Sequence, residues 1–80
     1  MLRDKASLLD IFQAGNLVLS FAEGIEREDL DKDQMRLSAI LYQIGIVGEA
    51  TKRLSSEFRE QNNHIPWGKV AGMRDIIFHQ

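Results

Sequence analysis

Two side chains near the end of the sequence, Arg74 and His79, are of the types that can cleave a phosphodiester. The arginine guanidinium is always charged and its planar donors suit a phosphate, whereas the histidine imidazole exchanges a proton near neutral pH. A base that removes the proton of a 2′-hydroxyl, with a cation beside the phosphate, is a minimal set of groups for cutting RNA without a metal ion. The pair is therefore a candidate catalytic site that needs no metal and no cofactor.

The spacing of the pair argues against a site built within one helix. Residues five apart on a helix differ by about 140° around its axis, so Arg74 and His79 point in different directions. Asp75 and His79 are four apart and do face each other, so Asp75 could orient the imidazole or raise its pKa. Taken alone, the segment favours a structural interpretation, in which Arg74 and Asp75 form salt bridges and His79 is incidental.

Other chemistries find less support in the sequence. Asp29, Asp31 and Asp33 resemble the start of a calcium loop, but Gln34 and Ile40 stand where that loop needs Gly and Glu. Cysteine is absent, so no disulfide or thiolate-bound metal is expected. A phosphate-binding Gly-Lys-Ser/Thr loop is also absent. His64 lies in a polar break and is expected to be an ordinary surface histidine.

The elements that must position these residues are predicted to be helices. Residues 4–23 carry two adjacent apolar stripes at helical spacing, and Gly24 ends that helix. The first stripe is Leu8, Phe12, Gly15, Leu19 and Ala22, and the second is Ile11, Ala14, Val18, Phe21 and Ile25. A face this broad predicts contact on two sides, as in the centre of a bundle or at a dimer contact.

Two further helices follow an acidic connector at residues 26–33, from which Asp31 or Asp33 can cap the next helix. Residues 34–60 are the longest helical pattern, uninterrupted by proline. After a break, Pro66 suits the first turn of a third helix with an apolar stripe of Val70, Met73 and Ile77. The fold class predicted from these patterns is all-α.

Four residues in these helices need a packing explanation. Gly45 and Gly48 each cost about 1 kcal/mol against alanine inside a helix, a cost usually offset by close approach of another backbone. Glu49 lies next to this small-residue face and would need a partner if it were buried. Trp67 is expected to be an anchor of the core.

Bulk properties limit the class of protein. The 80 residues form one domain, with 44% hydrophobic residues and a net charge of −2, so a polybasic nucleic-acid binder is excluded. A domain this small is marginally stable alone, which predicts a homo-oligomer.

The sequence contains neither a signal peptide nor a membrane-spanning run, and with no cysteine this predicts a cytoplasmic protein. The last helical pattern stops at Gln80 without a terminating residue, so we expect residues 1–80 to lack the C-terminal part of a longer domain.

Three blocks of the sequence resemble the HepT-like branch of the HEPN domain superfamily. Residues 46–55 resemble its Gly-Glu-Ala-x-Lys-Arg-Leu block, residues 65–67 its Pro-Trp sequence before the motif helix, and residues 72–79 its Arg-x4-His motif. The blocks occur in the expected order and spacing, and the resemblance spans nearly the whole chain.

The resemblance implies an antiparallel helical bundle that dimerises, in which the motif helices of two protomers meet. Arg74 of one chain would then lie near His79 of the other in a composite cleft, with Asp75 and Glu49 in supporting roles. It further implies a toxin, a metal-independent endoribonuclease acting on RNA, with a small nucleotidyltransferase antitoxin (MNT-like) as partner. In the best-matched members that antitoxin modifies a tyrosine two residues after the motif histidine, which corresponds here to position 81, beyond the sequence.

The alternatives predict different behaviour. A non-catalytic binding partner or regulatory subunit of a small nucleotidyltransferase would form a stable complex and cleave no RNA. A purely structural helical oligomer would lose stability, and no activity, when Arg74 is replaced.

Overall fold

The computed structural model describes residues 2–73 and residue 75. Within them the chain forms α1 (Leu2–Ala22), α2 (Arg27–Leu30), α3 (Gln34–Lys52), α4 (Ser56–Gln61) and α5 (Trp67–Ala71). The described residues contain no strand, which confirms the predicted all-α class. None of their helices is both long and apolar enough to cross a membrane.

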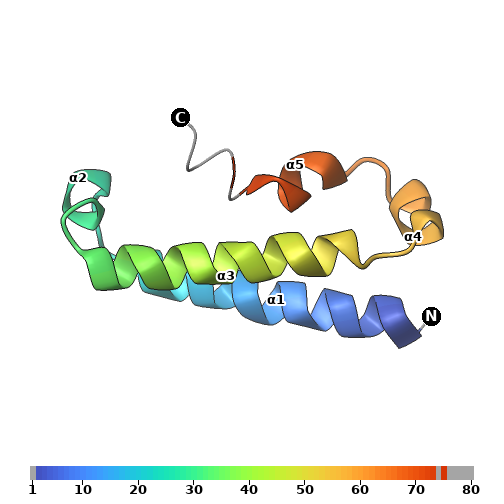
Figure 1. The fold of residues 1–80 in the computed structure, drawn as a ribbon, viewed down its shortest axis with the longest axis horizontal. Coiled ribbons are helices and arrows are strands. Elements are labelled where there is room, and N and C mark those ends of the chain that lie inside the picture. The colour runs from blue at the N-terminus through green and yellow to red at the C-terminus, as the bar shows by residue number, and fades with distance from the viewer. Residues whose placement is uncertain (1, 74, 76–80) are drawn as a thin grey trace.

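The long helices α1 and α3 lie antiparallel along each other, and α4 and α5 lead the chain back along α3 (Figure 1). Asp4, Ser7 and Ala14, the buried residues of α1, are three and seven apart, and Ile40, Ile44, Val47 and Thr51 on α3 are four, three and four apart. Both patterns keep one face of each helix towards the other. The buried apolar side chains are Ala14 on α1, Ile40, Ile44, Val47 and Ala50 on α3, and Leu54 just after α3. The core therefore lies along the α1–α3 contact.

Only one of the two apolar stripes predicted on α1 faces this core. Ala14 of the second stripe is 2% exposed, whereas Phe12 and Leu19 of the first are 65% and 72% exposed. The prediction of contact on two sides is thus met on one side by the residues the structure describes. The outer side of α1 remains an apolar surface.

The connector between α1 and α3 is largely as predicted. Gly24 follows the end of α1 with a φ of 73°, a left-handed conformation that glycine adopts without strain. Asp33 rather than Asp31 caps α3, because its Oδ1 accepts the backbone N–H of Arg36 at 3.1 Å. The short helix α2 lies within the segment predicted to be a polar connector.

The prediction of one uninterrupted helix over residues 34–60 is wrong. α3 ends at Lys52, and Ser55 begins α4 by accepting the N–H of Phe58 at 3.1 Å. The side chain of Asp4, at the start of α1, accepts the Ser55 backbone N–H at 2.8 Å and its hydroxyl proton at 2.7 Å. Because Asp4 is only 5% exposed, these bonds replace the water that its carboxylate would otherwise need.

Guanidinium groups satisfy the carbonyls that the break leaves free. Arg3 Nε donates to the Arg53 carbonyl at 2.8 Å, and Arg59 Nη2 donates to the Lys52 carbonyl at 3.0 Å. The last carbonyls of a helix lack intrahelical partners, and cations near them also complement the helix dipole. The end of α3 is therefore stabilised from α1 and from α4.

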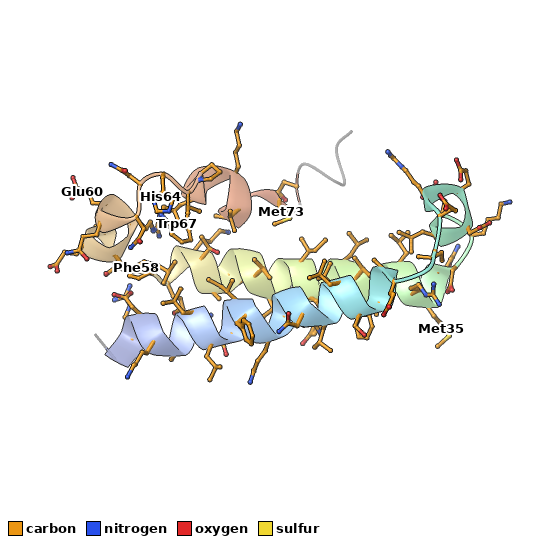
Figure 2. All side chains as sticks on the ribbon, turned by 180° about the vertical axis from the view of Figure 1, so that it is seen from behind. Met35, Phe58, Glu60, His64, Trp67 and Met73 are labelled. Atoms are coloured by element: carbon orange, nitrogen blue, oxygen red, sulfur yellow. The ribbon has the colours of Figure 1, made fainter. Side chains whose placement is uncertain are left out.

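Trp67 joins the two short C-terminal helices, and Pro66 precedes it directly, as predicted for the start of a third helix. The indole Nε1 donates to the Asn62 carbonyl at 3.1 Å, and the ring lies 5.9 Å from that of Phe58 at 55°. Figure 2 shows both rings at the same end of the molecule, between α4 and α5. The prediction that Trp67 anchors the core is wrong, because the side chain is half-buried and packs beside α4 rather than in the α1–α3 core.

Candidate functional site

A hollow of about 440 Å³ lies between α3 and the segment that contains α5. Its lining residues include two of the predicted site residues, Glu49 and Asp75. The others are Tyr42, Gly45, Ile46, Gly48, Lys52, Arg53 and Ala71. The structure thus brings two carboxylates from distant parts of the sequence to one surface.

Gly48 allows the two walls of this hollow to meet. A Cβ added to Gly48 would lie 2.8 Å from the carbonyl oxygen of Ala71 on α5, closer than real Cβ contacts come. The prediction that a helical glycine here is offset by close approach of another backbone is confirmed for Gly48. As a result, Ala71 lies directly against α3.

Glu49 is exposed at the surface of the hollow. Its Oε1 lies 3.4 Å from Lys52 Nζ, and the two side chains are 69% and 60% exposed. A pair this exposed contributes little stability, because water screens both charges. Glu49 is therefore free to change partners when a charged ligand arrives, which suits a supporting role in a site better than a role in the core.

Arg53 supplies a second cation at the same end of the hollow. Its Nη2 lies 2.9 Å from Asp10 Oδ2 on α1, with side chains about half exposed. The hollow therefore carries two acids, Glu49 and Asp75, and two bases, Lys52 and Arg53. This mixed charge can hold a phosphate beside a group that accepts a proton.

Asp75 has helical backbone and an exposed side chain, and it lines the hollow opposite α3. Arg74 and His79, the predicted catalytic residues, lie outside the described residues. The other histidine, His64, is exposed in the turn before α5, in agreement with its interpretation as a surface residue. Of the four predicted site residues, the structure thus places Glu49 and Asp75, and it places them together.

Three residues of the hollow were not predicted to belong to a site: Tyr42, Lys52 and Arg53. Together with Gly45, Ile46 and Glu49 they recur on α3 at spacings of three and four, which defines one helical face. This face could have been read from the sequence, since its aromatic and charged side chains, Tyr42, Glu49, Lys52 and Arg53, follow helical spacing. We call these six residues the α3 site face.

Comparison with known proteins agrees with this architecture. The model of a family described as ribonuclease HepT-like matches residues 11–80, which include both walls of the hollow. The chain therefore belongs to the HepT-like ribonuclease family. No solved structure matches it.

Curated relatives carry names of the same kind. The chain is 39% identical over 70 residues to a Caldanaerobacter subterraneus subsp. tengcongensis protein provisionally named an RNase, a match that covers 88% of this chain and 62% of the relative. A Methanocaldococcus jannaschii protein, also provisionally named an RNase, is 32% identical over 95% of this chain and 70% of its own length. A Thermococcus cleftensis protein provisionally named ribonuclease HepT is 35% identical over 94% of this chain and 68% of its own length. The chain thus spans between 62% and 70% of these relatives.

Proposed function

We propose that this protein is a metal-independent endoribonuclease and the toxin of a toxin–antitoxin pair. The observation that carries the proposal is the family match over residues 11–80, a range that includes Arg74, His79 and every residue that lines the hollow. Relatives provisionally named RNases support RNA as the substrate. Glu49 and Asp75 line the same hollow as Lys52 and Arg53, an arrangement of carboxylates and cations that suits acid–base chemistry on a phosphate.

The proposed reaction uses only groups of the protein and the RNA. His79 removes the proton of a 2′-hydroxyl, and the oxygen attacks the adjacent phosphorus. The bond from phosphorus to the 5′-oxygen breaks, and that oxygen leaves with a proton, giving a 2′,3′-cyclic phosphate and a 5′-hydroxyl. Arg74 stabilises the charge that develops on the phosphoryl oxygens. Asp75 orients the imidazole of His79 and favours its charged form.

The proposed site is shared by two chains. Arg74 and His79 are five residues apart, so on one helix they diverge by about 140° and cannot grip the same phosphate. A homodimer in which the two motif helices meet would place Arg74 of one protomer beside His79 of the other. Glu49 would then hold the arginine or a neighbouring cation, in place of its exposed contact with Lys52.

The proposed partner is a small nucleotidyltransferase antitoxin. This part of the proposal rests on the family resemblance of the motif blocks. It predicts that the two proteins purify together and that the complex no longer cleaves RNA.

The test is RNA cleavage by the purified full-length protein with Arg74→Ala and His79→Ala variants whose helical circular dichroism matches the wild type. We expect cleavage in the presence of EDTA, 2′,3′-cyclic phosphate ends, and loss of at least about a hundredfold in each variant. Glu60→Ala, an exposed residue of α4 outside the hollow, is the control and should cleave normally. Undiminished cleavage by both folded variants would refute the proposed site. A stable complex with the nucleotidyltransferase, but no cleavage of any RNA, would instead favour the regulatory-subunit alternative.

A further inference from the structure

The α3 site face has an aromatic ring at one end and cations at the other. Tyr42 is 69% exposed, although it is large and partly apolar, and it lines the hollow. Lys52 and Arg53 lie about 15 Å further along the axis, at 1.5 Å per residue. Exposed aromatic rings in line with cations are the combination by which proteins hold single-stranded nucleic acid without reading base pairs.

We propose that Tyr42 is a stacking platform for an unpaired base of the RNA substrate. The inference rests on the proposed ribonuclease function and adds a residue that determines which RNA the site accepts. Unpaired bases are recognised by stacking on aromatic side chains, whereas bases inside an A-form helix present no free face. The protein would accordingly prefer single-stranded segments, loops and bulges to duplex RNA.

The surroundings of Tyr42 leave room for a base. Gly45, which has no side chain, lies one turn further along the same face and also lines the hollow. The hollow, at about 440 Å³, falls within the range of roughly 300–1,000 Å³ typical of small-ligand sites. Tyr42 therefore borders a hollow of the size of a ligand site rather than a flat surface.

The position of Tyr42 gives it a role beside the reaction and not in it. Tyr42 and Glu49 are seven residues apart, about 10 Å along the axis of α3. A base stacked on Tyr42 would thus belong to a nucleotide near the cleaved bond and not to the reacting phosphate. Loss of the ring should weaken RNA binding more than it slows the chemical step.

A second copy of this chain fits the α3 site face less well than RNA does. Three of its six residues are charged, namely Glu49, Lys52 and Arg53, and the charged residue Asp75 lines the same hollow. The centres of protein–protein interfaces are depleted in charged residues. On the described part of the protein, exposed large apolar side chains gather instead on α1, where Leu9, Phe12, Leu17 and Leu19 are each at least 41% exposed.

The test measures binding separately from cleavage. A short fluorescent single-stranded RNA with 2′-O-methyl groups lacks the attacking hydroxyl, so the full-length protein can bind it without cutting it. We expect Tyr42→Leu to weaken this binding about tenfold, and Tyr42→Phe to stay within about twofold of wild type, because the ring is what stacks. Phe12→Leu, the same loss of an exposed ring on α1, is the control and should bind as wild type does. With Tyr42→Trp, the RNA should quench the fluorescence of the new indole.

The outcomes separate this inference from the proposed function. If wild-type protein cleaves RNA and Tyr42→Leu binds the probe as tightly as wild type, the stacking role is wrong and the ribonuclease function stands. If Tyr42→Leu changes the sedimentation of the protein without RNA, the face is a contact between copies and the inference is likewise overturned. If wild-type protein neither binds nor cleaves RNA, both proposals fail.

Discussion

At Gly48 the backbone of α3 touches the backbone of α5, and this contact depends on a missing side chain. Glycine inside a helix is unfavourable by about 1 kcal/mol against alanine, so its presence needs a compensating contact. The Ala71 carbonyl, 2.8 Å from where a Cβ would be, is that contact. Gly48 thereby determines how closely α5 lies against α3.

Replacing Gly48 should destabilise the protein although alanine is the better helix former. The new methyl group would meet a backbone oxygen that cannot rotate away, so we expect Gly48→Ala to lower the free energy of unfolding by about 1–2 kcal/mol. Gly15→Ala is the matched control: no atom lies within 4 Å of its added Cβ, and we expect a gain of about 0.5–1 kcal/mol. Urea unfolding of both variants measures the difference. Equal gains at the two glycines would contradict a close α3–α5 contact.

Asp4 gives stability a dependence on acid pH. Hydrogen bonds from the backbone and the side chain of Ser55 hold the pKa of Asp4 below its ordinary value of 3.8. A carboxyl whose pKa is lowered in the folded state stabilises that state above the unfolded pKa, and this stability is lost as pH falls through the folded pKa. We therefore expect wild-type stability to fall more steeply below about pH 3.8 than that of Asp4→Asn, measured by urea unfolding across acid pH. Parallel curves for the two proteins would contradict this role for Asp4.

At the scale of elements, the break between α3 and α4 determines where α4 and α5 lie. A helix continued from Gln34 to residue 60 would carry the chain away from the hollow. The turn at residues 53–55 instead lets α4 and α5 lie back along α3 (Figure 1). Ser55 holds this turn on both sides, as the cap of α4 and as a donor to Asp4.

Ser55→Ala should weaken this turn. The variant loses the cap on the Phe58 N–H and the hydroxyl donor to Asp4, so we expect a loss of about 1–2 kcal/mol in the free energy of unfolding. Ser56→Ala, at the exposed first position of α4, is the matched control and should change stability by less than about 0.5 kcal/mol. Chemical denaturation followed by circular dichroism makes the comparison. A similar cost at the two serines would show that the cap does not hold the turn.

At the scale of the whole molecule, a site shared between two chains makes a prediction that a site within one chain does not. Mixing inactive Arg74→Ala with inactive His79→Ala protein forms mixed dimers in which one of the two sites has both wild-type residues. Activity should then return to about a quarter of the wild-type level after random exchange of subunits. Cleavage assays before and after exchange test this. Mixtures that stay inactive, although sedimentation shows mixed dimers, would contradict the shared site.

Much of the described fold could be predicted from the sequence because it depends on neighbours within one helical turn. The apolar spacing predicted the two long helices, although not the end of the second at Lys52. Gly24 predicted the end of α1, Asp31 or Asp33 the start of α3, and Gly48 a close helix contact. Each of these signals acts over three or four residues, the range of a helical hydrogen bond or of a cap.

Tertiary structure alone decided the rest, because it brings together residues that are far apart in the sequence. The break after Lys52 depends on Asp4, which is 51 residues from Ser55, so the pattern of residues 34–60 contains no trace of that partner. The exposure of Phe12 and Leu19 depends on which side of α1 meets α3, and two similar stripes could not decide that from their spacing. Glu49 and Asp75 face one hollow only because the chain turns back at residues 53–55, so tertiary packing, and no local pattern, brings these two carboxylates together.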